Sequence, residues 1–546
     1  GPPSMPRRRC AEGTPARSAL LTFKLMLPLL VLGGVAQARA TVVGAGLVLD
    51  FTYTPYCDDV DELPAFRADE GYAALFEVIA PYRSLCRVPV PEGYTKRPAW
   101  PSCLFTLPKA NIPKAQVWES ESIKADQSWL KVEPESVVLP RDGGSMSARK
   151  FLEMLPEEVD LSAVRTVLDE GAGVCGLGAE LMMRSPRSQV VLSYAPHDTH
   201  TNQVQLCLER GVPAIIFSMA RYQFPVPPAS FDMVTCKWCW HWIGASSVGS
   251  WFLEVDRVLR EGGYFVMYAS VWHSYNFRDQ VETWSAHLGW RRIKGTAKDM
   301  AIWKKPDVVA MNTGSFLPCP QWEQEQPSFR RFHVPCRHMG PSRAEPMSEH
   351  QDMVGLDRDY VQELLTLMPE AQSFTNVLDA NSMLGTFGQA IRGALPNAWT
   401  LNVQHVKSQE YHHISPNASD GKLKGNYAAM SNYAKSVGRD GLPSVFAEGQ
   451  VGIYHDWCYM FPAYPRSFDI VHVRHVEVAH SNCFHTAVLE MDRLLRPGGY
   501  IVLTGRGLSK KVNPTVAAQL GWVPAQGTEH VVSVAQVYRK MGGTFE

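Results

Sequence analysis

The sequence repeats itself, and this repeat limits the possible folds more than any other feature. The paired segments are residues 231–234 with 468–471, 253–260 with 489–496, and 289–290 with 521–522. Their order is the same in both copies, and their offsets stay between 232 and 237 residues. In each copy the second segment runs directly into a Gly-Gly-Tyr turn and an apolar run. Ordered similarity at a nearly fixed offset predicts a duplicated structural unit.

Apolar, β-rich runs alternate with helical stretches in each copy. In the first copy the runs fall at residues 166–168, 190–194, 214–217, 233–236, 264–268 and 301–304. In the second they fall at residues 376–378, 400–403, 451–454, 470–473, 500–503 and 531–537. The alternation predicts an α/β fold with a mostly parallel sheet that helices cover on both faces. Because the last two runs of each copy are expected to be too close for a full crossover helix, we expect them to pair antiparallel.

The repeat and the shifts in composition divide the chain into five parts. These are a basic N-terminus with a signal peptide or signal anchor (residues 1–40), a luminal segment containing Pro and Cys (41–150), a first domain (151–305), a linker (306–370) and a second domain (371–546). A basic run followed by an apolar stretch and small residues is typical of a secretory signal. If Lys24 reaches the membrane interface, the same segment is a type II anchor instead.

Charge and cysteine content exclude several classes of protein. The 53 Lys and Arg nearly balance the 54 Asp and Glu, so no global field attracts nucleic acid or anionic lipid. The twelve cysteines are too scattered for a zinc ribbon. In an oxidising compartment we expect disulfides. The candidates are one bridge among Cys57, Cys86 and Cys103, and the pairs Cys319–Cys336 and Cys458–Cys483. Asn417 opens a glycosylation sequon.

A glycine-rich turn follows the first apolar run of the first copy, with the sequence Asp169-Glu170-Gly171-Ala172-Gly173. Glycine allows a positive φ and a close approach of the backbone to a ligand. In open α/β sheets, ligands bind at the carboxyl ends of the strands. The turn therefore predicts a ligand site, although a tight turn without a ligand is the alternative. A dinucleotide fold would place an acid at the end of the second strand, whereas the nearest acid here is Asp198.

These residues carry a resemblance to known enzymes. An acid-Gly-x-Gly turn, Phe-Asp before strand four and Leu-Arg-x-Gly-Gly before strand five resemble class I S-adenosylmethionine methyltransferases. More narrowly, the chain is similar to the plant family of pectin (homogalacturonan) methyltransferase-like proteins. The matching stretches are residues 53–58, 86–94, 98–101, 208–214, 454–458 and 464–469. The resemblance implies two tandem class I (Rossmann-like) domains in a Golgi type II membrane protein.

The resemblance also assigns roles to residues of the first copy. Asp169, Gly171 and Gly173 would line the methionine end of the cofactor, and Asp198 would reach its ribose. Asp232 is also expected among the cofactor-binding residues, because it opens the strand whose end would face the transferred methyl group.

The second copy departs from this pattern. Its turn reads Asp379-Ala380-Asn381-Ser382-Met383, so a methionine stands where a glycine is expected. A side chain there would block the close approach of the ligand. We therefore expect a degenerate second domain and one cofactor per chain.

The expected reaction is methyl transfer from S-adenosyl-L-methionine to an acidic cell-wall polysaccharide, with the galacturonate carboxyls of pectin as first candidate. Carboxyl groups have pKa values near 4, so an ionised acceptor needs alignment rather than a general base. A hydroxyl acceptor would need a base, and His200 and His241 are weak candidates. The expected location is the Golgi lumen, with a wall-synthesis complex as possible partner; secretion after signal cleavage is the alternative.

Other interpretations remain open at this stage. The protein could be a non-catalytic scaffold or a glycan-binding partner, or an NAD-dependent oxidoreductase. Cys236-x-x-Cys239 suggests a metal or haem, but no second Cys or His pair lies at zinc spacing, so we expect no metal. The basic stretch 330–343 is a solvated linker or a groove wall for a polyanion. His455-Asp456 is a proton-transfer pair or a buried corner.

Overall fold

The computed structural model describes part of the chain. The described residues are 42–43, 46–47, 87–112, 131–139, 148–184, 189–195, 203–217, 219, 223–237, 239, 243, 248–268, 275–293, 300–307, 350–405, 440–457, 460–474, 476, 483–504, 508, 511–525 and 535–542. Contacts group Ala38–Glu546 into one compact unit. This unit contains both halves of the repeat, so the domain boundaries expected from the sequence remain a prediction.

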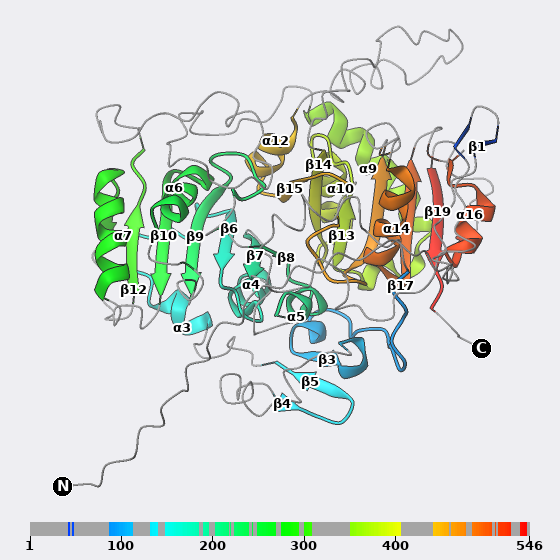
Figure 1. Ribbon diagram of the computed structural model, residues 1–546, viewed down its shortest axis with the longest axis horizontal. Helices are drawn as coiled ribbons and strands as arrows, with labels where there is room; N and C mark the ends of the chain where they lie inside the picture. Colours follow the sequence, from blue (N-terminus) through cyan, green and yellow to red (C-terminus); the bar gives the residue numbers. More distant parts are fainter. Residues whose placement is uncertain are drawn as a thin grey trace, which may run out of the picture. The chain divides into compact units, whose positions relative to one another are not determined.

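The first half folds into a seven-stranded sheet with the strand order β11-β12-β10-β9-β6-β7-β8 (Figure 1). Its strands are β6 (Thr166–Glu170), β7 (Val190–Ala195), β8 (Ala214–Ile216), β9 (Phe231–Lys237), β10 (Leu259–Tyr268), β11 (Arg291–Ile293) and β12 (Met300–Lys304). Its helices are α3 (Ala148–Glu153), α4 (Gly176–Met183), α5 (Gln203–Arg210), α6 (Val248–Val258) and α7 (Tyr275–His287). The strands from β8 to β10 run parallel.

The second half forms a sheet of equivalent order, β15-β14-β13-β16-β17-β19-β18. Its strands are β13 (Asn376–Asp379), β14 (Trp399–His405), β15 (Val451–His455), β16 (Phe468–Arg474), β17 (Leu495–Thr504), β18 (Trp522–Pro524) and β19 (Ala535–Lys540). Its helices are α9 (His350–Thr366), η9 (Pro369–Ser373), α10 (Thr386–Ala394), α12 (Leu442–Ala447), α14 (Phe484–Leu494) and α16 (Pro514–Gln519). Both sheets have the Rossmann-like strand order 3-2-1-4-5 in their parallel part.

The last strand of each half is antiparallel to its neighbour, as predicted, but the predicted reason was wrong. β12 pairs antiparallel with β10, and β19 pairs antiparallel with β17. A helix does lie in between, α7 in the first half and α16 in the second. That helix leads to a further strand, β11 or β18, which the sequence did not reveal, and the last strand then returns between the two.

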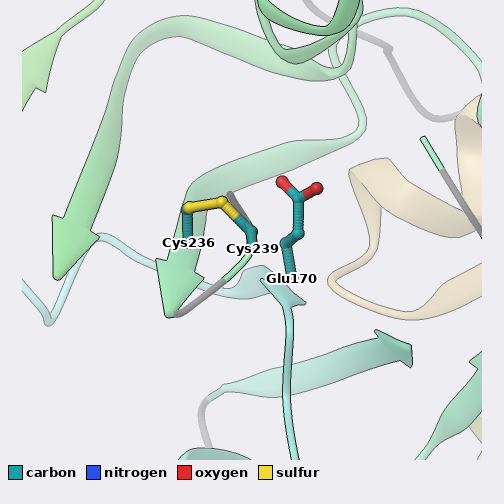
Figure 2. Close-up of side chains that lie close together, drawn as sticks. All are labelled: Glu170, Cys236 and Cys239. Atoms are coloured by element: carbon teal, nitrogen blue, oxygen red, sulfur yellow. A yellow bond between two sulfur atoms is a disulfide. The ribbon is translucent and has the colours of Figure 1, made fainter. Parts of the chain in front are cut away.

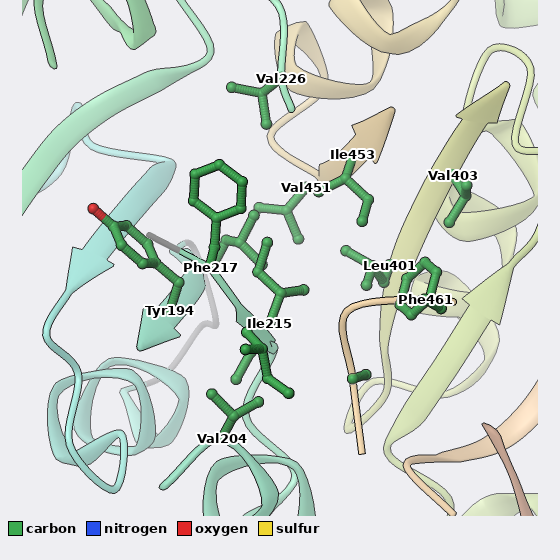
Figure 3. Close-up of a cluster of buried hydrophobic side chains, with 14 of the residues drawn as sticks. Tyr194, Val204, Ile215, Phe217, Val226, Leu401, Val403, Val451, Ile453 and Phe461 are labelled. Atoms are coloured by element: carbon green, nitrogen blue, oxygen red, sulfur yellow. The ribbon is translucent and has the colours of Figure 1, made fainter. Parts of the chain in front are cut away.

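The two halves meet where β8 and β15 form the edges of their sheets, and the same contact is made twice. Ile216 N donates a hydrogen bond to Pro462 O, and Tyr454 N donates one to Pro225 O, both at 2.8 Å. Pro225 and Pro462 are equivalent in the repeat. Apolar side chains from both sheets pack there into one core, which includes Phe217 and residues of β14 and β15 (Figure 3). This reciprocity resembles the isologous interface of a symmetric dimer.

A polar network at the amino-terminal edge of the sheet also occurs in both halves. Asp232 accepts hydrogen bonds from Arg165 N and Thr166 N at 2.8 and 2.9 Å, and it forms an ion pair with Arg260. Asp469 occupies the equivalent place and accepts from the backbone N–H groups of residues 375 and 376. Each carboxylate thus joins the start of the first strand to the start of the fourth.

The segment before the first half packs on both halves. η3 (Ser102–Leu104), β3 (Thr106–Pro108), η4 (Lys109–Asn111), β4 (Lys131–Val132) and β5 (Ser136–Val138) belong to it; the three strands form a sheet of order β3-β5-β4. Leu107 and Val137 pack with Leu206 of α5, while Arg97 forms an ion pair with Asp469 of the second half. The sequence did not indicate the contact with the second half. A short pair, β1 (Val42–Val43) and β2 (Gly46–Leu47), precedes it.

Two further expectations concern the linker and the N-terminus. Helix α9 lies within the segment expected to be a linker (306–370), and its Val361 and Leu364 pack in the core that contains Phe387 and Ile391 of α10. Residues 1–40 lie outside the described ranges. Within those ranges, no helix is long and apolar enough to cross a bilayer.

Candidate functional site

The candidate site lies where the strand order of the first sheet reverses. β6 has β7 on one side and β9 on the other, and the connections lead away in opposite directions from this point. Ligands of open α/β sheets bind in the crevice outside the carboxyl ends of such strands. Here the ends of β6 and β9 bring Asp169 opposite Thr235 and Glu170 opposite Cys236.

The turn between β6 and α4 has left-handed backbone conformations that suit glycine. Gly171 and Gly173 adopt φ of 67° and 55°. A Cβ built on Gly173 would meet no atom within 4 Å, so the turn opens onto unfilled space among the described residues. Cys175 caps α4, also with a left-handed φ of 56°. The turn therefore leaves room for a ligand to approach the backbone closely.

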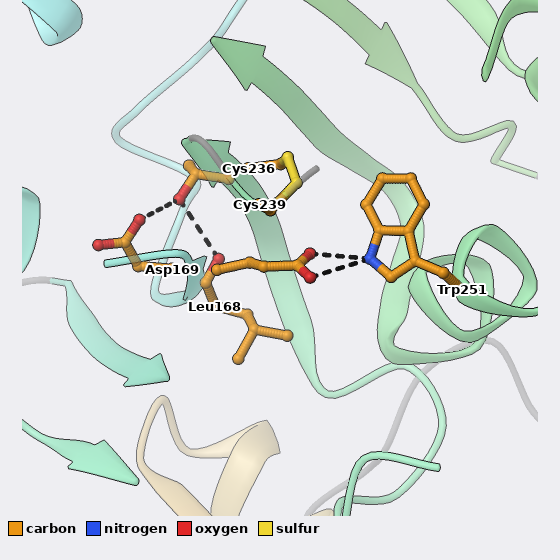
Figure 4. Close-up of a disulfide and its surroundings, with 7 residues drawn as sticks. Leu168, Asp169, Cys236, Cys239 and Trp251 are labelled. Atoms are coloured by element: carbon orange, nitrogen blue, oxygen red, sulfur yellow. Dashed lines mark hydrogen bonds between the residues drawn. A yellow bond between two sulfur atoms is a disulfide. The ribbon is translucent and has the colours of Figure 1, made fainter. Parts of the chain in front are cut away.

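The buried polar atoms at this edge that have no hydrogen-bond partner among the described residues include Asp169 Oδ2 and Ser193 Oγ, the latter at the equivalent level of β7. The other carboxylate oxygen of Asp169 accepts a hydrogen bond from Thr235 Oγ1 at 2.7 Å (Figure 4). Burial raises the pKa of Asp169, although the nearby ammonium of Lys237 and the Thr235 bond oppose this. An unsatisfied buried carboxylate oxygen is costly, and a bound group with N–H or O–H donors would satisfy it.

Glu170 is the second buried acid of the site, and its carboxylate contacts α6. Both of its carboxylate oxygens accept from Trp251 Nε1, at 3.0 and 2.9 Å (Figure 4). Burial raises the pKa of Glu170 to about 7; the nearby Tyr194 hydroxyl and the hydrogen bond from Trp251 oppose the rise, and the charge of Asp169 adds to it. Glu170 therefore changes its protonation near neutral pH.

A disulfide joins Cys236 at the end of β9 to Cys239. The Glu170 carboxylate and both sulfurs lie within 4.8 Å of one another, a grouping that would suit a metal if the cysteines were thiolates (Figure 2). Since each sulfur is bonded to the other, neither offers a thiolate ligand. The absence of a metal stays a prediction. The disulfide was missed, because the sequence analysis considered this motif only as a metal or haem site.

A second disulfide, between Cys175 and Cys207, ties the start of α4 to α5. It too was absent from the expected pairings. Among the predicted pairs, Cys57, Cys86, Cys319, Cys336 and Cys458 lie outside the described residues. Cys483 is disulfide-bonded, and Cys103 is buried. Spacing does not reveal the Cys175–Cys207 pairing, because it depends on α5 packing beside the turn.

In the second half, protein side chains fill the corresponding place. His472 stands where the first half has Thr235, and its Nδ1–H donates to Asp379 Oδ1 at 2.9 Å. Phe387 stacks on the His472 ring with centroids 3.8 Å apart, and Tyr360 of α9 contacts its other nitrogen. Burial lowers the pKa of His472 although the adjacent Asp379 raises it, so the ring is neutral at neutral pH.

The turn of the second half is closed as well. Met383 occupies the position of Gly173, with a left-handed φ of 52°, and it is buried. The chain before α12 lies directly against it, since a Cβ on Gly441 would fall 1.7 Å from Met383 O. Trp457 Nε1 donates to Ala380 O at 2.8 Å. No space comparable to that beside Gly173 is left among the described residues of this turn.

The structure brings together only some of the predicted site residues. Asp169, Gly171 and Gly173 lie together at the carboxyl edge of the first sheet. Asp232 lies at the opposite edge, where its bonds to β6 and Arg260 give it a structural role, so its prediction as a cofactor residue is corrected. Asp198, His200 and His241 lie outside the described residues. The basic stretch 330–343 and Asn417 also lie outside them.

Sequence interpretation missed Glu170, Thr235 and Lys237 as parts of this edge. The only signal for the last two was their place at the end of the fourth strand, which the Phe-Asp motif marks. His455 is fully buried and packs edge-on against Trp457 and Phe461, with centroids 5.0 Å away, as expected for a buried corner.

Comparison with known proteins agrees with this geometry. Over residues 52–315 and 424–534 the chain matches the family described as "Putative S-adenosyl-L-methionine-dependent methyltransferase". "Probable methyltransferase PMT21" from Arabidopsis thaliana is 29% identical, covering 81% of this chain and 76% of its own length. "Probable methyltransferase PMT2" is 28% identical (86% and 80%), and "Probable pectin methyltransferase QUA3" is 28% identical (77% and 71%); both are from the same plant.

The residues at the first turn fit this cofactor. S-adenosylmethionine carries an amino group, hydroxyls and a charged sulfonium, and the turn supplies an unpaired buried carboxylate oxygen beside open space. The second turn does not fit it, because a buried methionine replaces Gly173 and because His472, stacked on Phe387, already bonds the equivalent carboxylate of Asp379.

Proposed function

This chain belongs to the family of S-adenosyl-L-methionine-dependent methyltransferases, and on that premise we propose that it methylates galacturonate carboxyls of pectin. The protein is a methyltransferase and its cofactor is S-adenosyl-L-methionine. The acceptor is the proposed part. One support is the relative whose name describes it as a pectin methyltransferase. The other is the chemistry of a carboxylate acceptor.

The observation that carries the proposal is the open turn at Gly173 beside the unpaired Asp169 oxygen. When bound, the cofactor supplies an electrophilic methyl group on a positively charged sulfur. Asp169, Gly171 and Gly173 hold and orient it at the end of β6. Strand β9 ends next to this turn, so the acceptor would approach from the side of the carboxyl end of β9.

A galacturonate carboxylate is already ionised, because its pKa lies far below the pH of the secretory pathway. The chain then has no proton to remove and acts by aligning the acceptor oxygen and excluding water. Glu170 fits this scheme as a positioning residue, because its carboxylate accepts the hydrogen bond of Trp251.

We further propose that the two halves are tandem class I domains and that only the first binds the cofactor. The buried Met383 in the second turn supports this, and so does the open space beside Gly173 in the first. The second half would then shape the acceptor groove or stabilise the pair. Duplicated folds need not share activity, because function depends on the site.

We also propose a location in the Golgi lumen, with the N-terminal segment as a type II anchor and a wall-synthesis complex as partner. Two disulfides and the disulfide-bonded Cys483 support an oxidising compartment. If the protein is luminal, endoglycosidase treatment of protein from plant cells should lower its mass, and Asn417→Gln should abolish this shift. A protein fully exposed to protease in intact vesicles would contradict the proposal.

The acceptor is tested with the full chain and radiolabelled S-adenosylmethionine. We expect label to enter de-esterified pectin as a base-labile methyl ester, and not to enter fully esterified pectin. Gly173→Met serves as the inactive control. Label that resists mild base would indicate an ether on a hydroxyl and would contradict the carboxylate acceptor.

A further inference from the structure

A cavity of about 490 Å³ lies in the second half, at the edge of the sheet opposite to the closed turn. It is formed where Arg496–Gly499 at the start of β17, the end of β19 and the end of η9 meet residues 94–97. Its volume lies within the range of roughly 300–1,000 Å³ that is usual for ligand pockets. None of the residues assigned to the cofactor site belongs to it.

The lining of this basic cavity carries more cations than acids. The cations are Lys96, Arg97, Arg496, Arg539 and Lys540, and the acids are Glu370 and Asp469. The inner charges are neutralised within the protein, since Arg97 and Arg496 share Asp469 and Lys540 pairs with Asp492 at 3.0 Å.

At the rim, two cations face a single acid. Lys96 is exposed, and the Arg539 side chain is 44% exposed. Arg539 pairs with Glu370 at 3.1 Å, and Glu370 also accepts a hydrogen bond from Tyr500. Because Glu370 already has two partners, the rim retains net positive charge toward solvent.

The first half provides an internal control for this site. By strand register, Lys304 is the counterpart of Arg539, since each pairs with the tyrosine that follows the Gly-Gly turn. In the first half this turn is closed by Asp307, whose carboxylate oxygen would lie 2.5 Å from a Cβ on Gly262 and lies 3.8 Å from Lys304.

The second half has lost both acids of that turn. The repeat aligns Glu261 with Pro497, and two residues beyond Lys305 and Lys540 it aligns Asp307 with Gly542. Removing two negative charges and one side chain opens the cavity and leaves its rim basic. The change is confined to the half in which the cofactor turn is closed.

The rim also offers apolar surface. Met541 is 47% exposed, and Phe374 and Tyr94 line the cavity beside it. Cations next to apolar and aromatic side chains suit a ligand that has both carboxylates and the apolar faces of sugar rings. We propose that the basic cavity binds a carboxylate-bearing saccharide chain, apart from the site of methyl transfer. The choice of a uronate as ligand rests on the proposed function.

The test uses the full chain and measures binding of a de-esterified oligogalacturonate by calorimetry. The double variant Lys96→Gln, Arg539→Gln should bind it roughly tenfold more weakly, because two exposed charge contacts are lost. The matched control, Lys304→Gln at the equivalent place in the first half, should change the affinity less than about twofold. Raising the salt concentration should weaken binding to the unmodified protein but hardly to the double variant.

Three results would overturn this inference. They are equal binding by the double variant, equal binding of a fully methyl-esterified oligomer, and displacement of the oligomer by inorganic phosphate at equal concentration. The last would mark a general anion site. Methyl transfer is assayed on the same samples. Binding through Lys96 and Arg539 without methylation would refute the proposed function alone, whereas methylation with unaltered variant binding would refute the basic cavity alone.

Discussion

The two halves of this protein share a sheet, a helix order and a polar network, but they differ at the place where a cofactor would bind. In the first half the turn after β6 opens onto space beside an unpaired carboxylate oxygen. In the second half, His472 forms a hydrogen bond with Asp379, the equivalent of Asp169, and Met383 stands at the position of Gly173. The fold is thus retained by interactions at one edge of the sheet, while the opposite edge is free to lose or keep a ligand.

The largest expected effect, on cofactor affinity, comes from replacing Gly173 of the first half by methionine, the residue at the equivalent position of the second half. Met383 tolerates φ of 52°, so Gly173→Met at 55° should fold, at a backbone cost of about 1–2 kcal/mol. The new side chain would fill the open space, and the affinity for S-adenosylhomocysteine should fall by more than about a hundredfold. Calorimetry measures this. The reciprocal variant, Met383→Gly, should not create a second site; unaltered binding by a folded Gly173→Met protein would contradict the assignment.

The next effect concerns the contact between the turn after the first strand and the helix that packs beside it, which the two halves make in different ways. Cys175 and Cys207 are joined in the first half, whereas the equivalent Gly385 simply packs against Val445. Replacing both cysteines by serine should lower the free energy of unfolding by about 3–4 kcal/mol, because the disulfide closes a loop of 32 residues. Urea unfolding measures the loss. Removal of Cys236–Cys239 in the same way should cost less, since that loop is much shorter; equal losses would argue against the loop-closure explanation.

Glu170 makes the stability of the first half depend on pH. In the second half the equivalent residue is Ala380, which does not titrate. The pKa of Glu170 rises from 4.5 to about 7 on folding, so the folded state holds the proton more tightly and stability falls as pH rises from 4.5 to 7. Glu170→Gln keeps an acceptor for Trp251 without titrating. As the pH rises from 5 to 8, the free energy of unfolding of the variant should increase by about 3 kcal/mol relative to that of the unmodified protein. Glu282→Gln, which replaces a half-buried acid of α7 that pairs with Arg292, serves as control. If the pH profile of Glu170→Gln ran parallel to that of the unmodified protein, Glu170 would not titrate as a buried acid.

The smallest effect compares the two aspartates that end the first strands. Asp379→Asn should lower the free energy of unfolding by about 2 kcal/mol, because a charge-assisted bond to buried His472 is weakened. It should leave cofactor binding unchanged. Asp169→Asn should do the reverse, with weaker cofactor binding and little loss of stability, since its second oxygen has no partner among the described residues. Swapped outcomes would place the cofactor in the second half.

Much of the fold was predictable because the repeat supplies the same pattern twice. Every predicted apolar run overlaps a described strand, although residues 531–534 of the last run lie outside the described ranges, and β11 and β18 were not predicted. The glycine turn was located by its sequence. Asp232 was misassigned, although the repeat held the clue: its counterpart Asp469 persists in the half whose turn is degenerate, which indicates a structural role.

The remainder depends on tertiary packing, which spacing does not encode. The Cys175–Cys207 bridge requires α5 to lie beside the turn, and the disulfide at Cys236 requires a bend at the end of β9. The closure of the second turn by His472 and Phe387 likewise involves elements that are far apart in the chain. Met383 indicated that a ligand would be excluded, but not which side chains would replace it.

The most direct test of the central claim is the number of cofactor molecules that one chain binds. Titration of the full chain with S-adenosylhomocysteine in a calorimeter should give one site per chain. That site should be lost in Gly173→Met and retained in Asp379→Asn. Two equivalent sites, or a single site that survives Gly173→Met but disappears in Asp379→Asn, would contradict the account.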